Sequence, residues 1–366
     1  MPTTAEDLRF MSRAIELAER GRGHAEPNPL VGCVVVQDSE LVGEGWHQRF
    51  GSPHAEVEAL AVAGDAAQGS TVYVTLEPCC HQGKTGPCTR ALIEAGVQRV
   101  VVGCQDPNPQ IAGKGLAELR EARILVEEGI CADQAQYLIA PFAKFISKGR
   151  PWIIAKWAMT LDGKLASRTG NSQWISGTAS RAVVHRLRGE VDAILVGRGT
   201  VESDDPLLTA RPEGPRIATR VVLDSAASLS PESQLIRSLT QGPVLVAVAA
   251  VAPADRIGRL EKLGVEVFHT SGRDEASRLE SLLEEMGRRQ WTNVLVEGGA
   301  KVFGTLLDMQ AIDEVHAFIA TKIVGGEEAP SAIAGQGIAQ MEDAVDLSHV
   351  EVKVLEGDLY VHGRMS

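Results

Sequence analysis

The sequence has no long hydrophobic run and no excess of positive charge, and each shortage excludes a class of protein. Its longest apolar run, residues 244–252, is closed by Pro253. This run is far shorter than the roughly 20 residues of a membrane-spanning helix and predicts a buried strand. The formal net charge of −12 argues against a protein that holds nucleic acid mainly by neutralising phosphates. We therefore expect neither a membrane nor a nucleic acid as partner.

Aromatic residues and cysteines are also few, at 4% and six residues in a chain of 366. Residues 4–18 place Leu8, Met11 and Ile15 on one helical face behind a possible cap at Thr4, and no basic segment precedes an apolar core. This pattern predicts a cytoplasmic protein, in which thiols stay reduced. Because three of the six cysteines lie within ten positions, metal binding explains them better than disulfides do.

The chain reads as two successive α/β domains. Apolar strand-like runs alternate with helix-like stretches up to about residue 147, and the alternation restarts after the Pro/Gly-bearing segment 147–151. Turn residues at 38–40 and 356–358 predict two hairpins. We therefore predict domains at 1–147 and 151–366.

The first half contains a metal-binding pattern. His54 follows a proline at a predicted helix start, Cys79 follows a strand and Pro78, and Cys88 lies nine positions later. One imidazole and two thiolates suit Zn²⁺ and leave a fourth position for water, whose pKa zinc lowers. Glu56, two residues from His54, is the candidate proton shuttle. His-x-Glu with a later Pro-Cys and Cys is the signature of zinc deaminases.

The spacing of the two cysteines leaves alternatives open. Eight residues separate Cys79 from Cys88, against two in the common form. Cys80 and His81 lie in this insert and could compete as ligands, although Cys79 directly follows the proline. His81 and Lys84 in the same insert suggest recognition of an anionic substrate such as a phosphate ester.

Two Pro-Asn-Pro stretches, around Asn28 and Asn108, place asparagine amides in rigid turns near strand ends. Such amides can recognise both donors and acceptors of a heterocycle. Together with His47, they complete the candidate site.

The stretches PNPLVGCVVV, GEGWHQRFGSPHAE, YVTLEPCCHQGKTGPC and QDPNP resemble the bacterial bifunctional riboflavin-biosynthesis deaminase–reductase family. The similarity continues in KWAMTLDGK, GNSQWIS, VGRGTVESDDPLLTAR and VEGGAKVFGTLL, and so spans nearly the whole chain. It implies a cytidine-deaminase-like three-layer α/β/α domain followed by a dihydrofolate-reductase-like α/β domain. It also implies that the substrate contacts of the first domain are Asn28, His47, His81, Lys84 and Asn108.

Without the resemblance, the residues of the second half indicate less about function than those of the first half. VEGGAKVFG follows a predicted strand and opens a helix, whose free backbone N–H groups could receive a phosphate. VGRGTVE begins like a dinucleotide fingerprint, but Glu202 occupies the third glycine position. No acid–base residue stands out.

The resemblance implies that this half binds NADPH and reduces a ribosyl group to a ribityl group. The implied dinucleotide contacts are Ala158, Trp174, Thr200, Asp204, Ser225, Gly299, Ala300, Lys301, Val302, Phe303, Gly304 and Thr305. The implied sugar-phosphate contacts are Ser172, Arg188, Leu208, Arg211 and Glu297.

We therefore expect a two-step enzyme of flavin biosynthesis. It would deaminate a diamino-ribosylamino-pyrimidinone 5′-phosphate and then reduce the product's ribose, and self-association is expected because metabolic enzymes of two domains often form homo-oligomers. Two alternatives remain at this point. One is a deaminase acting on a nucleoside or on RNA, and the other is a non-enzymatic sensor whose zinc is structural and closed by a fourth protein ligand.

Overall fold

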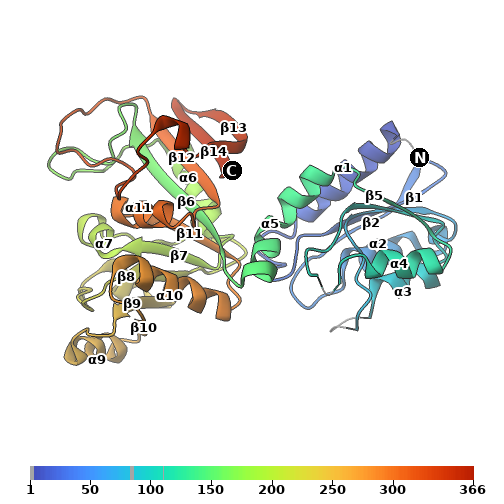
Figure 1. Ribbon diagram of the computed structural model, residues 1–366, viewed down its shortest axis with the longest axis horizontal. Helices are drawn as coiled ribbons and strands as arrows, with labels where there is room; N and C mark the ends of the chain where they lie inside the picture. Colours follow the sequence, from blue (N-terminus) through green and yellow to red (C-terminus); the bar gives the residue numbers. More distant parts are fainter. Residues whose placement is uncertain (1–3, 83–85, 110) are drawn as a thin grey trace. The chain divides into compact units, whose positions relative to one another are not determined.

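The computed structural model describes residues 4–82, 86–109 and 111–366 (Figure 1). It consists of two compact units, which meet in the sequence at Gly149 and Arg150. Among the described residues, no helix is both long and apolar enough to span a bilayer. Each unit has its own sheet and its own hydrophobic core.

The first unit is built on a five-stranded sheet in the order β2-β1-β3-β4-β5. β1 pairs antiparallel with both β2 and β3, whereas β3, β4 and β5 run parallel. The parallel part is buried on both sides, which explains why β3 and β4 are almost continuous runs of apolar residues. The strands are β1 (Gly32–Gln37), β2 (Glu40–Trp46), β3 (Thr71–Leu76), β4 (Arg99–Cys104) and β5 (Leu125–Glu128).

Helices cover both faces of this sheet. One core joins the sheet to α2, α3 and α4, and another joins it to α1, while α5 packs near α1 and β4. The helices are α1 (Ala5–Glu19), α2 (Ala55–Ala63), α3 (Cys88–Glu94), α4 (Lys114–Glu121) and α5 (Ala132–Lys148). This arrangement confirms the three-layer α/β/α fold.

The second unit is built on a nine-stranded sheet in the order β10-β9-β8-β7-β11-β6-β12-β14-β13. Its strands are parallel from β10 to β12, and β14 and β13 add an antiparallel edge. The strands are β6 (Trp152–Thr160), β7 (Ala193–Gly197), β8 (Thr219–Leu223), β9 (Val244–Ala249), β10 (Glu266–Thr270), β11 (Asn293–Gly298), β12 (Glu314–Ala320), β13 (Leu347–Leu355) and β14 (Asp358–Met365).

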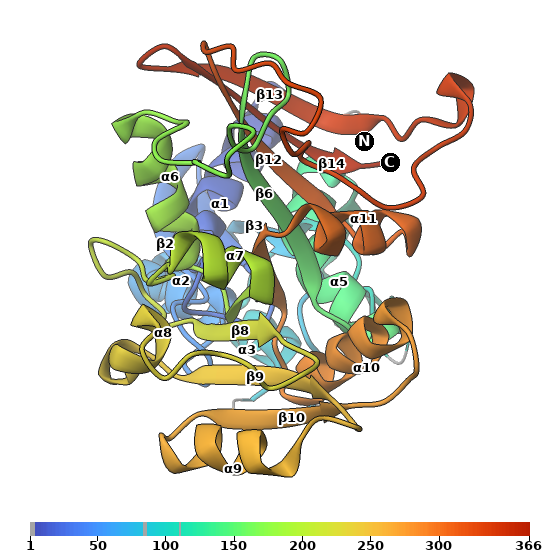
Figure 2. The ribbon, with the colours of Figure 1, turned by 90° about the vertical axis from the view of Figure 1, so that its left-hand side faces the viewer.

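Two cores lie on opposite faces of the second sheet, and the helices of this unit are labelled in Figure 2. One core includes α10 and α11, and the other includes α7, α8 and α9 with Leu187 of α6 packed against it. The helices are α6 (Thr178–Arg188), α7 (Arg198–Asp204), α8 (Gln234–Arg237), α9 (Ala254–Lys262), α10 (Glu275–Arg288) and α11 (Ala300–Asp308).

Several local predictions are confirmed. Thr4 caps α1 in a capping box with Asp7. The turn residues at 38–40 and 356–358 lie at the ends of the β1–β2 and β13–β14 hairpins. Of residues 244–252, predicted to form one buried strand, Val244–Ala249 form β9 and are all buried, whereas 250–252 form a turn in which Val251 is 91% exposed.

Candidate functional sites

The structure brings His54, Cys79 and Cys88 together in the first unit. His54 is the residue before α2, Cys88 is the first residue of α3, and Cys79 follows β3 after Glu77 and Pro78. His54 Nδ1 lies 3.2 Å from Cys88 Sγ and 3.5 Å from Cys79 Sγ. Donor atoms at zinc-bond lengths of about 2.0 Å for nitrogen and 2.3 Å for sulfur lie about 3.5 Å apart around a tetrahedral ion. The three side chains therefore fit zinc.

The two thiols of the cluster share one proton, because the hydrogen bond between them lowers the pKa of Cys79 and raises that of Cys88. The Cys88 thiol donates to Cys79, and this hydrogen bond lowers the pKa of Cys79 against the opposing effect of burial, with His54 and the Cys88 backbone N–H adding to it. A thiolate is the form that binds metal. Cys80 lies outside the cluster, and burial raises the pKa of its thiol. The geometry thus agrees with Cys79, rather than Cys80, as the thiolate that faces His54.

Glu56 lies in the first turn of α2, and only 3% of its surface is exposed. Burial, reinforced by the negative charge on Cys79, raises the pKa of its carboxyl group to about 7. A carboxyl group with a pKa near neutrality can both take up and release a proton under working conditions. This is the property that a proton shuttle needs.

A cavity of about 360 Å³ lies beside these residues. Its lining includes Asn28, His47, His54, Glu56, Cys79, His81 and Asn108. Asn28 Nδ2 lies 3.0 Å from His47 Nε2, and His47 Nδ1 lies 3.1 Å from the Pro53 carbonyl oxygen. Burial lowers the pKa of His47, which favours a neutral ring that donates to Pro53 and accepts from Asn28. The predicted Lys84 lies outside the described residues.

Sequence reasoning missed Glu77, which holds one wall of this cavity in place. Its buried carboxylate accepts hydrogen bonds from the backbone N–H groups of Asp106, Gly113, Gly115 and Leu116. These bonds fix the loop that carries Asn108 against the end of β3. The sequence did offer a signal for Glu77, because an acidic residue stands directly before Pro78 at the end of a mostly apolar strand. Phe142 and Ile146 of α5 also line this cavity, but nothing in the sequence indicated that they belong to the site.

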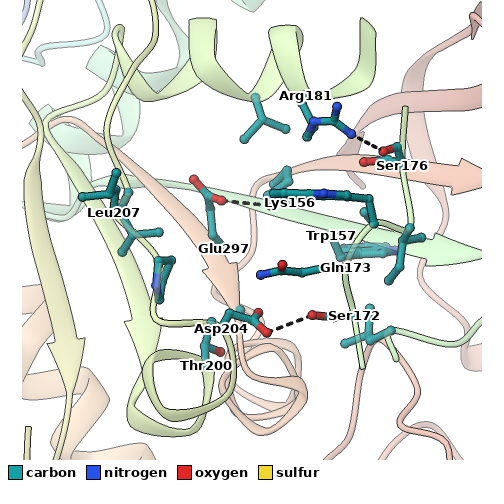
Figure 3. Close-up of a pocket in the computed structure, with 18 of the residues that line it drawn as sticks. Lys156, Trp157, Ser172, Gln173, Ser176, Arg181, Thr200, Asp204, Leu207 and Glu297 are labelled. Atoms are coloured by element: carbon teal, nitrogen blue, oxygen red, sulfur yellow. Dashed lines mark hydrogen bonds and ion pairs between the residues drawn. The ribbon is translucent and has the colours of Figure 1, made fainter. Parts of the chain in front are cut away.

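The second unit has a larger cavity, of about 760 Å³, lined by residues of β6, of the end of β11 and of α7 (Figure 3). Glu297 of β11 is buried there between two cations. Arg188 donates to both of its carboxylate oxygens, at 2.5 and 2.8 Å, and Lys156 Nζ lies 2.9 Å from Oε2. Burial alone would raise the pKa of Glu297, but the charges of Arg188 and Lys156 hold it well below its usual range.

The segment around Gln173 and α7 also line this cavity. Ser172 donates to Asp204 at 2.9 Å, and Arg181 lies over the ring of Trp174, 4.9 Å from its centre. Glycines line the turn into α11, where a Cβ on Gly298 would lie 2.8 Å from Thr200 Oγ1 and Gly299 has a φ of 91°. These glycines let the turn pack closely on Thr200 and Val302, and the free backbone N–H groups at the start of α11 fit the phosphate of a dinucleotide.

Eleven predicted residues of the second half line this cavity: Ala158, Ser172, Trp174, Arg188, Thr200, Asp204, Leu208, Arg211, Glu297, Gly299 and Phe303. The other six are Ser225, Ala300, Lys301, Val302, Gly304 and Thr305, and they are not part of the lining. Val302 and Gly304 are buried within α11. The lining also includes Gln173, Arg181 and Leu207, for which sequence reasoning assigned no role.

Comparisons with known proteins cover both units. Residues 4–104 match the cytidine and deoxycytidylate deaminase zinc-binding region, and residues 151–361 match the RibD C-terminal domain. The riboflavin biosynthesis protein RibD of Actinobacillus pleuropneumoniae is 38% identical over 97% of this chain and 94% of its own length.

Solved structures agree over the whole length. Acinetobacter baumannii RibD is 37% identical, with a TM-score of 0.86 over 99% of both chains. A Thermotoga maritima diaminohydroxyphosphoribosylaminopyrimidine deaminase/5-amino-6-(5-phosphoribosylamino)uracil reductase is 36% identical, with a TM-score of 0.84 over 99% of both chains.

These matches decide among the three functions considered from the sequence. A nucleoside or RNA deaminase with an accessory domain would not match RibD over its second half, and a zinc sensor would match neither activity. The predicted combination of a cytidine-deaminase-like domain with a reductase domain is confirmed. The chain belongs to the RibD family, the bifunctional zinc-dependent deaminases and NADPH-dependent reductases of riboflavin biosynthesis.

Proposed function

We propose that the two activities are divided between residues 1–147 and 151–366 and that the residues gathered at each cavity carry them out. The deaminase unit would act on 2,5-diamino-6-ribosylamino-4(3H)-pyrimidinone 5′-phosphate. The reductase unit would convert the ribosyl group of the product to a ribityl group, giving 5-amino-6-ribitylamino-uracil 5′-phosphate. The observation that carries the deaminase assignment is the convergence of His54, Cys79 and Cys88 beside the buried Glu56.

In the deaminase unit, His54, Cys79 and Cys88 would hold the zinc ion. Zinc so held supplies a Lewis acid that makes water a stronger nucleophile at neutral pH. Hydrolysis adds the water oxygen to the ring carbon and releases the exocyclic amine as ammonia. Glu56 takes a proton from the water and delivers it to the leaving amine, so that its own protonation is restored at the end.

Substrate recognition falls to the polar lining of the cavity. Asn28 and Asn108 present amides to the heterocycle, and His47 is held as a neutral ring by its two hydrogen bonds. His81 lines the same cavity, and Lys84 belongs to the same set of substrate contacts. Both side chains come from the insert between Cys79 and Cys88, and both are suited to bind the phosphate ester of the substrate.

In the reductase unit, NADPH supplies a hydride, and the protein binds and orients the two reactants. Ala158, Trp174, Thr200, Asp204, Ser225 and residues 299–305 would contact the dinucleotide. Ser172, Arg188, Leu208, Arg211 and Glu297 would hold the sugar phosphate. Support comes from the cavity, in which Arg188 and Arg211 are suited to bind a phosphate.

The test uses Glu56→Gln, with Glu58→Gln on the same helix as the matched control. Glu58 is outside the cavity lining. Loss of the proton shuttle should lower ammonia release 10²–10⁴-fold in Glu56→Gln, while bound zinc and NADPH oxidation on pre-deaminated substrate stay as in the unchanged enzyme. Glu58→Gln should behave like the unchanged enzyme. Undiminished ammonia release from Glu56→Gln would refute the assigned role.

We further infer a cytoplasmic homo-oligomer. All six cysteines are free, which suits a reducing compartment. Strand β13 lies at the edge of its sheet and exposes Val350, Val352 and Val354, at 52%, 60% and 71% of their surfaces. An exposed apolar edge strand is a natural surface for pairing between copies, and sedimentation equilibrium of the full chain measures the state directly.

A further inference from the structure

A second cluster of metal-ligating side chains lies in the reductase unit. Glu314 and His316 are on β12, and His362 is opposite His316 on the neighbouring strand β14. Glu314 Oε1 lies 2.8 Å from His316 Nε2 and 2.9 Å from His362 Nε2. Three potential ligand atoms thus converge within 4.8 Å of one another. We propose that Glu314, His316 and His362 form a second site for a divalent transition metal.

Glu314 Oε2 and His316 Nδ1, which lie outside the converging set, form hydrogen bonds with other side chains. The indole N–H of Trp152 donates to Glu314 Oε2 at 2.9 Å, and Tyr360 Oη lies 2.8 Å from His316 Nδ1. Metal-binding histidines and carboxylates are usually oriented by such contacts to their remaining polar atoms. The cluster therefore has both the ligands and the outer contacts of a built site.

The hydrogen bond between His316 and Tyr360 can adapt to a bound ion. Without metal, both Nε2–H groups donate to Glu314 Oε1, and the Tyr360 hydroxyl donates to His316 Nδ1. With metal on Nε2, the proton of His316 moves to Nδ1 and donates to Tyr360 Oη, since a phenol both donates and accepts. Ligand atoms about 2.0–2.1 Å from a tetrahedral ion lie about 3.3 Å apart, so the side chains need to separate by about 0.5 Å.

Charge and access determine the kind of ion. Two imidazoles and one carboxylate suit first-row divalent cations such as Zn²⁺ and Co²⁺, and no thiolate takes part. His362 and Glu314 keep 15% and 13% of their side chains exposed, which gives an ion a route from solvent. Arg364 Nε lies 3.9 Å from Glu314 Oε2. Burial lowers the pKa of His316, and the charges of His362 and Arg186 add to this effect against that of Glu314. These two arginines make the site weaker than the deaminase site, whose two thiolates add negative charge.

The experiment counts ions in the full chain. The protein is stripped of metal, dialysed to equilibrium against Co²⁺ and analysed for bound cobalt by elemental analysis. Two ions per chain are expected, one at each cluster. His362→Gln and Glu314→Gln should bind one, with unchanged thiolate-to-cobalt absorption from the deaminase site. His269→Gln, an exposed histidine of β10, is the matched control and should bind two.

The count on the unchanged chain does not depend on any variant folding. One ion per chain there would show that the cluster is only a hydrogen-bonded network and would overturn the proposal. A second ion that survives in both His362→Gln and Glu314→Gln would overturn it as well, because the ion would then be bound elsewhere. Circular dichroism verifies that each variant is folded before its ions are counted.

Discussion

At the scale of single residues, two buried carboxyl groups differ in protonation because their neighbours differ. Glu56 lies beside a thiolate, and burial raises its pKa to about 7. Glu297 is buried as well, but Arg188 and Lys156 hold its pKa well below the usual range. The first group can exchange protons at neutral pH, whereas the second stays an anion and fixes the positions of two cations.

Glu297→Gln should destabilise the reductase unit by about 3–5 kcal/mol at pH 7, because two buried cations lose their counter-charge. A carboxyl whose folded pKa is depressed contributes its stabilisation above the unfolded value of about 4.3 and loses it as pH falls toward the folded value. The gap between the unchanged chain and the variant should therefore narrow below about pH 4.3, by up to about 1.4 kcal/mol per pH unit.

Urea unfolding at pH 7, 4 and 3 measures this gap, with the exposed Glu328→Gln as a control that should change little at any pH. A gap that stayed constant with pH would show that Glu297 is not the titrating anion of this pair.

At the scale of elements, the deaminase site depends on how closely α2 packs on β2. A Cβ on Gly45 would lie 2.4 Å from the Ala55 carbonyl oxygen and 2.5 Å from the Ala59 nitrogen. Both are backbone atoms, so Gly45→Ala must displace the helix that starts directly after His54 and carries Glu56. We expect a loss of about 1–3 kcal/mol in stability, less bound zinc and slower ammonia release.

Gly258→Ala in α9 is the matched control, because nothing lies within 4 Å of its added Cβ. That change should stabilise the chain slightly, by about 0.5–1 kcal/mol, because alanine is the better helix former. Zinc content and urea unfolding distinguish the two variants. If Gly45→Ala were destabilised but kept its full zinc content, metal binding would not depend on how closely α2 packs on β2.

The sequence predicts features that depend on neighbouring residues better than features that depend on distant ones. Turn residues and apolar patterns predict the two hairpins because these signals are local. The zinc ligands Cys79 and Cys88 lie 25 and 34 positions from His54, and they were predictable because their residue types and order form a known signature. The role of Glu77 depends on backbone groups about 30–40 positions away, and no local pattern encodes such partners. The order of the nine strands, in which β6 lies between β11 and β12, likewise follows from packing across the whole second unit.

At the scale of the whole molecule, the chain consists of two units that are each compact. Each has its own sheet, and each core cluster draws its residues from one unit. The first unit ends with α5, which is closed by Gly149 in a left-handed conformation, as is common at helix ends. Arg150 begins the second unit and pairs with Glu280 of α10. A break between Gly149 and Arg150 therefore cuts no core.

Chains 1–149 and 150–366 should therefore fold when produced separately. The first should bind zinc and release ammonia from the phosphorylated diamino-pyrimidinone. The second should oxidise NADPH with the deaminated product, and a mixture of the two should carry out both steps. Elemental analysis, ammonia release and NADPH absorbance measure these outcomes, with the intact chain as reference. A soluble, zinc-loaded first chain that releases no ammonia would mean that the deaminase needs residues of the second unit, because its metal centre alone would then be insufficient.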